Sequence, residues 1–207
     1  MTGNRWLQMI AENPGHSAWY IERFRNMAAE GADLEGEARF IDTMIPRQAR
    51  VLDAGCGPGR VGGPLARLGH TVVGVDIDPA LIAAAERDHP GPTWLTADLA
   101  TLDLPSMGIV EPFDAIVCAG NVMTFLDPDT RRLTVTRLAA HLATGGRLTV
   151  GFGSDRGYGF DEFVTDAENA GLTVELQLAS WDLRPFHDAA DFLVAVAALS
   201  ESRSNSG

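Results

Sequence analysis

The sequence predicts an α/β fold: a mostly parallel seven-stranded sheet with helices on both faces and an antiparallel strand from a C-terminal hairpin. Three observations predict it. Between residues 50 and 152, short apolar runs alternate with helical patterns, which is typical of parallel strands joined by crossover helices. The 207 residues are 45% hydrophobic, which suits one domain with a sizeable core. The tail ends in two β-like runs joined by a turn.

The first 48 residues are predicted to be helical. Aromatic and methionine side chains recur at helical spacing over residues 16–29, and a second helix is expected over 33–45, where Pro46 ends it.

The predicted strands of the core are short and apolar, as expected for strands buried on both faces, and lie at 50–53, 71–76, 93–96, 113–118 and 147–152. Helices are expected up to Leu68, over 79–87 and over about 129–143. The first of them contains Gly62, Gly63 and Pro64, which disfavour a helix interior. It is therefore expected to begin late or to hold Pro64 in its first turn.

The C-terminal part follows a different pattern. A helix is expected near 161–170, followed by strands at 172–181 and 190–199. The turn at 184–188 joins these strands as a hairpin, so the last strand is expected to run antiparallel to the rest. The Ser-rich residues 200–207 are expected to be frayed.

Charge and composition restrict the partners. The net charge is −12, all 16 basic residues are Arg, and no basic stripe appears, so nucleic acid is disfavoured. No apolar run approaches the roughly 20 residues of a membrane span, and the N-terminus lacks a secretory pattern. We expect a cytoplasmic monomer or homodimer with a small-molecule substrate. Cys56, Cys118 and the histidines match no metal spacing, so we expect reduced thiols and no metal.

The strongest motif follows the first strand. Gly55, Gly57 and Gly59 alternate there, which lets the backbone turn sharply and approach a ligand closely. The next helix presents unpaired N–H groups and a positive dipole end. An acidic strand end, Asp76, comes about 20 residues later, as nucleotide-type sites require.

A nicotinamide dinucleotide site is the obvious alternative. Its Gly-x-Gly-x-x-Gly/Ala fingerprint would place Arg60 where a small residue must pack closely. Asp53 would repel a pyrophosphate but suits a ligand with an ammonium group. The sequence therefore disfavours this alternative.

Over about residues 47–152, the sequence resembles the class I S-adenosylmethionine-dependent methyltransferases, which have a Rossmann-like fold. The resemblance implies that the glycine loop, with Cys56, holds the methionine part of the cofactor, and that Asp53 lies near its ammonium. Asp76 would accept hydrogen bonds from the ribose hydroxyls, and Ile77 would pack on the adenine.

The same resemblance implies that Asp98 and Leu99 bind the adenine, and that Ala119-Gly120-Asn121 lies beside the sulfonium. Asp76 and Asp98 have an alternative as turn or cap residues. We expect one domain over 1–207, made of a helical lid (1–48), a cofactor-binding core (49–152), a C-terminal helix and hairpin (153–199) and a tail (200–207).

In the lid, Trp19 and Tyr20 are predicted to cover the cofactor, and Arg23 or Arg25 to meet its carboxylate. The alternative is a packed amphipathic helix with solvated arginines.

The predicted acceptor contacts lie in two loops. Met123 and Phe125 follow the fourth strand, with core packing as the alternative. Arg156 and Tyr158 lie in a Gly-rich loop after the fifth strand, with a plain surface loop as the alternative. His187 is a candidate base, although a surface histidine is favoured.

We therefore predict an enzyme that transfers a methyl group to a small-molecule acceptor by in-line displacement, leaving S-adenosylhomocysteine. Catalysis is expected to come mainly from positioning, and no catalytic residue is assigned. The alternative is a non-catalytic S-adenosylmethionine-binding regulatory module.

Overall fold

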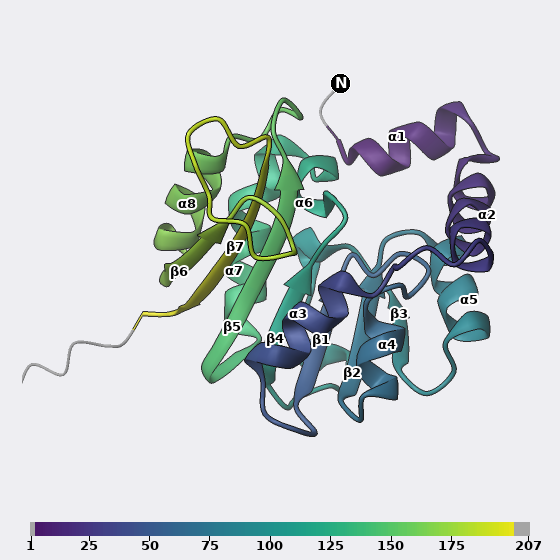
Figure 1. Cartoon of the computed structure of the whole chain (residues 1–207), viewed down its shortest axis with the longest axis horizontal. Coiled ribbons are helices and arrows are strands. Elements are labelled where there is room, and N and C mark those ends of the chain that lie inside the picture. Colours follow the sequence, from purple (N-terminus) through teal and green to yellow (C-terminus); the bar gives the residue numbers. More distant parts are fainter. Residues whose placement is uncertain (1–2, 201–207) are drawn as a thin grey trace, which may run out of the picture.

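A seven-stranded sheet forms the centre of the structure, a computed structural model that describes residues 3–200 (Figure 1). The strands are β1 (Arg50–Ala54), β2 (Thr71–Asp76), β3 (Thr93–Thr96), β4 (Phe113–Cys118), β5 (Leu142–Gly153), β6 (Leu172–Leu178) and β7 (Phe192–Leu199). Their order is β3-β2-β1-β4-β5-β7-β6. Strands β1 to β5 pair in parallel, and β7 runs antiparallel to both β5 and β6. The predicted fold class is confirmed.

Alternate residues of the strands enter two hydrophobic clusters. Leu52, Val73 and Ile116 belong to one cluster, whereas their neighbours Val51 and Val72 belong to the other. This alternation follows from the two-residue period of a strand, and it means that both faces of the sheet are covered.

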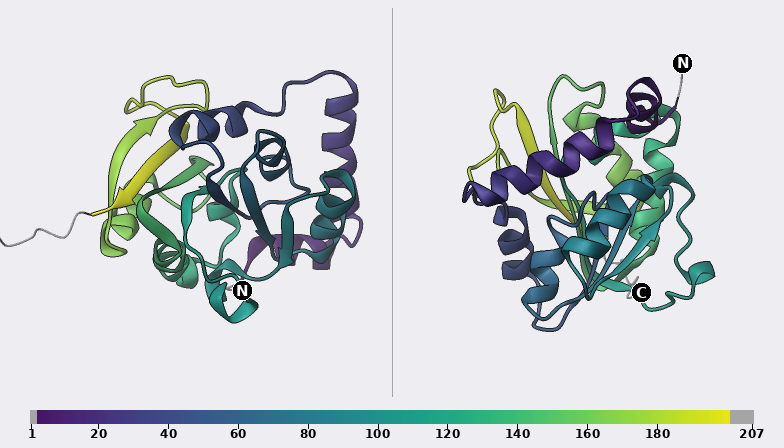
Figure 2. Two further views of the ribbon diagram at one scale, coloured as in Figure 1. Left: turned by 90° about the horizontal axis from the view of Figure 1, so that it is seen from below. Right: turned by 90° about the vertical axis from the view of Figure 1, so that its right-hand side faces the viewer.

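Helices cover these faces and the carboxyl end of the sheet. They are α1 (Arg5–Glu12), α2 (His16–Ala29), α3 (Gly36–Met44), α4 (Gly62–Arg67), α5 (Pro79–Asp88), α6 (Val122–Phe125), α7 (Arg131–Ala140) and α8 (Phe160–Asn169). Helix α2 lies against α5 beside the β3 edge, at the right of Figure 1 and in front in the right-hand view of Figure 2. No helix in residues 3–200 combines the length and apolarity that crossing a membrane requires.

Several boundaries differ from the prediction. The lid contains an additional helix, α1, which begins because Asn4 accepts hydrogen bonds from the first-turn N–H groups of Trp6 and Leu7. Helix α4 begins at Gly62, so Pro64 does lie in its first turn, where a missing N–H costs nothing. Strand β5 begins five residues earlier than predicted, at Leu142. Residues 201–207 of the predicted frayed tail lie outside the described residues.

Candidate functional site

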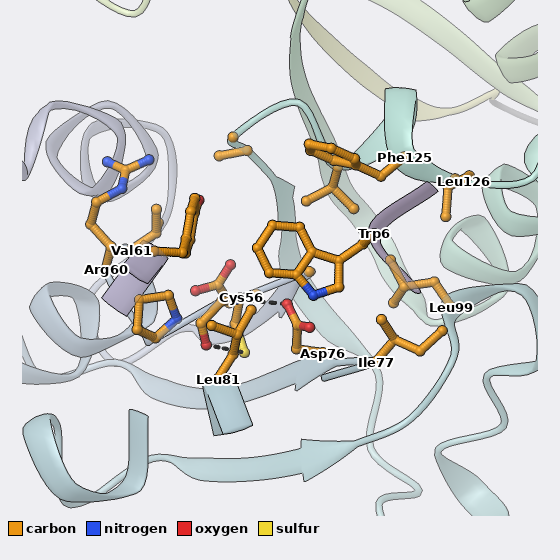
Figure 3. Close-up of a pocket in the computed structure, with 18 of the residues that line it drawn as sticks. Trp6, Cys56, Arg60, Val61, Asp76, Ile77, Leu81, Leu99, Phe125 and Leu126 are labelled. Carbon is orange, nitrogen blue, oxygen red and sulfur yellow. Dashed lines mark hydrogen bonds between the residues drawn. The ribbon is translucent and has the colours of Figure 1, made fainter. Parts of the chain in front are cut away.

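A pocket lies at the carboxyl ends of β1, β2 and β4, beside the helices α1 and α2 of the predicted lid (Figure 3). It contains about 800 Å³ of empty space, counting the part open to solvent. The strand order reverses between β1 and β4, and ligands of open α/β sheets bind at such a switch point.

The glycine loop forms the floor of this pocket. Gly55 and Gly57 have φ angles of 78° and 54°, and a Cβ on Gly55 would lie 2.4 Å from Val122 Cγ2. Gly55, Cys56 and Gly57 line the pocket, so a ligand meets bare backbone there. Gly59 does not line it. A Cβ at Gly59 would lie 2.9 Å from His89 Cδ2, so this glycine serves packing instead.

Two buried carboxyl groups face the glycine loop. Asp53 is 1% exposed, and its Oδ2 accepts a hydrogen bond from the Gly62 backbone N–H at 2.8 Å. Asp76 is 8% exposed and accepts from the backbone N–H groups of Gly57 at 2.8 Å and Asp78 at 2.9 Å. Burial raises the pKa of Asp53 to about 7 and that of Asp76 to about 6. Both groups line the pocket and change charge close to neutral pH.

The wall beyond Asp76 is apolar. Ile77, Leu81 and Leu99 line it together with Asp98, whose Oδ1 also accepts from the Ala100 N–H at 2.9 Å. The cap interpretation and the pocket position therefore both hold for Asp98.

The loop after β4 contributes Ala119 and Gly120 to the pocket, but not Asn121. The Oδ1 atom of Asn121 accepts from the Gly153 N–H at 2.8 Å, which ties the end of β4 to the end of β5. The prediction that Asn121 lies at the ligand is therefore corrected to a structural role.

Only part of the predicted lid contact reaches the pocket. Tyr20 lines it, whereas Trp19 is 55% exposed and lies beside His16 and Arg23. Successive residues of a helix point about 100° apart, so Trp19 and Tyr20 cannot face the same way.

Arg25 also lies away from the pocket. It pairs with Asp88 at 3.0 Å and with Glu22 at 2.6 Å, on the surface of the lid. The predictions for Trp19 and Arg25 are therefore wrong in position. Trp6 occupies the place expected of Trp19, and the i, i+4 pair Trp6 and Ile10 was the sequence signal for it.

Of the four predicted acceptor contacts, Phe125 alone lines the pocket. Met123 is fully buried in the core, because it points to the opposite side of the one-turn helix α6. Tyr158 is buried against Phe152, and its hydroxyl donates to Asp166 at 2.7 Å.

Arg156 is exposed, and His187 is a surface residue outside the pocket lining. The acceptor predictions for Met123, Tyr158 and Arg156 are therefore not supported by where these side chains lie.

Arg60 is a pocket residue that the sequence did not predict. Its guanidinium donates to both Glu37 carboxylate oxygens at 2.6 and 2.7 Å and to the Leu34 carbonyl at 3.1 Å. In the sequence, Arg60 indicated only that a dinucleotide site is disfavoured. Its position directly after Gly59 was the feature from which its place in the pocket could have been predicted.

The residues present fit S-adenosylmethionine. Asp76 offers a buried carboxylate to a ribose, and Ile77 and Leu99 offer apolar contact to a flat adenine ring. The glycine loop leaves room for an ammonium group, to which Asp53 offers a carboxylate.

Comparison with known proteins gives consistent results. A family model described as a methyltransferase domain matches residues 51–146. The chain is similar to a solved structure from Corynebacterium glutamicum, described as a TehB-like SAM-dependent methyltransferase. The identity is 46% and the TM-score 0.86, over 91% of this chain and 100% of that one.

Two curated relatives are also methyltransferases by name. An uncharacterized methyltransferase of Mycobacterium tuberculosis is 40% identical over 114 residues, which is 54% of each protein. A ubiquinone biosynthesis O-methyltransferase of Xanthomonas campestris is 33% identical over 61% of this chain and 56% of that protein. The chain spans about half the length of the curated relatives it matches.

Proposed function

This chain belongs to the class I S-adenosylmethionine-dependent methyltransferases, and from that premise we propose that it methylates a small-molecule acceptor by in-line displacement. The predictions of an enzyme and of S-adenosylmethionine as its cofactor are confirmed by its relatives, which do not favour a non-catalytic module. One observation supports the proposal most strongly. A single pocket brings together the glycine loop, two buried carboxyl groups and two apolar walls.

In the proposed arrangement, Asp76 accepts hydrogen bonds from the ribose hydroxyls, and the adenine lies between Ile77 and Leu99. Asp53 attracts the ammonium of the methionine part. Arg60 is the one cation among the described lining residues, and its ion pair with Glu37 leaves it a structural part of the pocket wall. The arrangement thus gives each of the two buried carboxyl groups, Asp53 and Asp76, a polar partner on the cofactor.

When bound, S-adenosylmethionine supplies an electrophilic methyl group, and S-adenosylhomocysteine remains after transfer. The described lining residues include no histidine, glutamate or lysine, and the lining aspartates Asp53, Asp76 and Asp98 are all proposed to contact the cofactor. The chain therefore contributes by orienting the acceptor and excluding water, which favours an acceptor that is already nucleophilic at neutral pH.

The acceptor side of the pocket is aromatic. Trp6, Tyr20, Phe24 and Phe125 line it, so we propose an acceptor with a flat or apolar body. Because a ubiquinone biosynthesis O-methyltransferase is among the relatives, phenols that ionise near neutral pH are the first compounds to test.

The proposal is tested by titration calorimetry with S-adenosylmethionine, S-adenosylhomocysteine and NAD. We expect both sulfur compounds to bind and NAD not to bind. Asp76→Ala should weaken binding by about 1–3 kcal/mol, because it removes a charged hydrogen-bond acceptor.

The control is Asp103→Ala, which removes an exposed aspartate outside the pocket and should leave binding unchanged. Transfer of labelled methyl to phenols, amines and thiols then identifies the acceptor class. Binding of NAD alone, or equal binding by the wild type and Asp76→Ala, would contradict the proposed site.

A further inference from the structure

Asp78 holds both lid helices with one carboxylate oxygen. The residue is 2% exposed, and its Oδ1 caps α5 by accepting from the Ala80 N–H at 2.8 Å. The other oxygen, Oδ2, accepts from Trp6 Nε1 in α1 at 3.0 Å and from the Ser17 hydroxyl in α2 at 2.5 Å. We call these two contacts the Asp78 latch. The latch joins α1 and α2 to the start of α5.

The latch places an aromatic ring across the pocket. The indole of Trp6 packs edge to face against Tyr20, at a centroid distance of 5.1 Å, and against Phe125 of α6, at 5.8 Å. Figure 3 shows this indole between Asp76 and Phe125. Trp6 therefore spans the pocket from the side of α5 to the side of α6.

The latch also adjoins the floor of the pocket. The backbone N–H of Asp78 donates to Asp76 Oδ1 at 2.9 Å, while Asp76 Oδ2 accepts from the Gly57 N–H at 2.8 Å. Asp78 itself is not among the pocket-lining residues. The short segment from Asp76 to Asp78 thus bonds to the glycine loop through Asp76 and to the lid helices through Asp78.

We infer that Asp78 is a positioning residue whose carboxylate, acting through Trp6 and Ser17, keeps the lid closed. It thereby sets the rates at which the cofactor enters the pocket and the product leaves it. The inference rests on the proposed cofactor site. Every latch contact is made between residues of the chain itself and needs no ligand. The latch therefore stabilises the closed lid equally before and after binding, so it controls rates in both directions and not affinity.

The test is stopped-flow association and dissociation of S-adenosylhomocysteine with Asp78→Asn and, separately, Ser17→Ala. The asparagine amide has one oxygen, so whichever way it turns, it cannot accept from both Ala80 and the lid. Ser17→Ala removes one donor and leaves the cap of α5 intact. Asp103→Asn is the control, because this exposed aspartate accepts only local bonds, from Ser106.

For Asp78→Asn, we expect the association and dissociation rate constants to rise together by about tenfold, the size of a lost hydrogen bond to a charged group. The Kd should stay within about threefold of the wild-type value, because both directions change alike. Ser17→Ala should change both rates in the same direction by less. Amide hydrogen exchange over residues 5–29 should accelerate in both variants and stay unchanged in Asp103→Asn.

Two results would overturn the inference: unchanged rate constants, or a raised Kd with unchanged association, which would leave Asp78 as a cap that only supports the shape of the site. Failure of the wild-type protein to bind S-adenosylhomocysteine would instead overturn the proposed function. The two failures are therefore distinguishable.

Discussion

Burial has moved the ionisation of two pocket residues close to neutral pH. The pKa of Asp53 is raised to about 7 and that of Asp76 to about 6, because each carboxyl is almost fully removed from water. Both are proposed to act as carboxylates toward the cofactor. At low pH, a proton must therefore leave each group before the ligand can bind well.

Cofactor affinity should rise with pH. We expect the Kd for S-adenosylhomocysteine to fall about tenfold or more between pH 5.5 and 8 and then to level off, as Asp76 and then Asp53 ionise. Calorimetry across this range measures it. Asp53→Asn and Asp76→Asn should each flatten part of the profile, and a flat wild-type profile would contradict the proposed roles.

The free energy of unfolding of the ligand-free protein should change with pH in the opposite direction to the cofactor affinity. Both folded pKa values lie above the ordinary value of 3.8, so the folded chain holds protons that the unfolded chain releases. The contribution of these groups to the free energy of unfolding therefore falls as pH rises from about 4 to about 7.

Among the helices, α4 shows why a sequence of low helix propensity can occur beside the pocket. Its first turn contains Gly62, Gly63 and Pro64. A Cβ on Gly63 would lie 2.3 Å from His89 Nδ1, and one on Gly62 would lie 2.9 Å from Trp94 Cη2. The glycines let α4 approach these side chains, and tertiary packing thereby overrides helix propensity.

Alanine should therefore destabilise α4, although alanine favours a helix. For Gly63→Ala we expect the free energy of unfolding to fall by about 1–3 kcal/mol through overpacking, measured by urea denaturation. Gly36→Ala, at the first turn of α3, is the control. Its Cβ would meet nothing closer than 3.9 Å, so stability should stay equal or rise by up to about 1 kcal/mol. Equal effects of the two substitutions would contradict this account.

At the scale of the whole molecule, the pocket is built from the lid, the strand ends and α6, so ligand binding joins parts that are distant in sequence. A ligand that binds only the folded protein stabilises it by mass action, by about 2.7 kcal/mol at 100 times the Kd. For a chain of this size, that corresponds to a rise of about 5–10 °C in Tm.

We expect this rise with S-adenosylhomocysteine in a thermal melt, and no rise with NAD. Asp76→Ala should show a smaller rise at the same ligand concentration, because its binding is expected to be weaker by about 1–3 kcal/mol. A rise of equal size for Asp76→Ala would show that the stabilising ligand binds elsewhere.

Local patterns in the sequence were enough to predict the fold class, the order of the strands along the chain and most of the pocket residues that we propose as cofactor contacts. Apolar strand runs, alternate glycines and acids at strand ends are local patterns, and their physics acts over a few residues. For this reason Gly55, Asp53, Asp76, Ile77 and Asp98 could be predicted as pocket residues, and the structure does place them there.

The side chains that complete the pocket from outside that core could be identified from the three-dimensional structure alone. Trp6 and Tyr20 reach it while Trp19 does not, and Phe125 lines it while Met123 is buried. These choices depend on how each helix is rotated against the sheet. That rotation is set by packing between segments far apart in sequence, which no local pattern records.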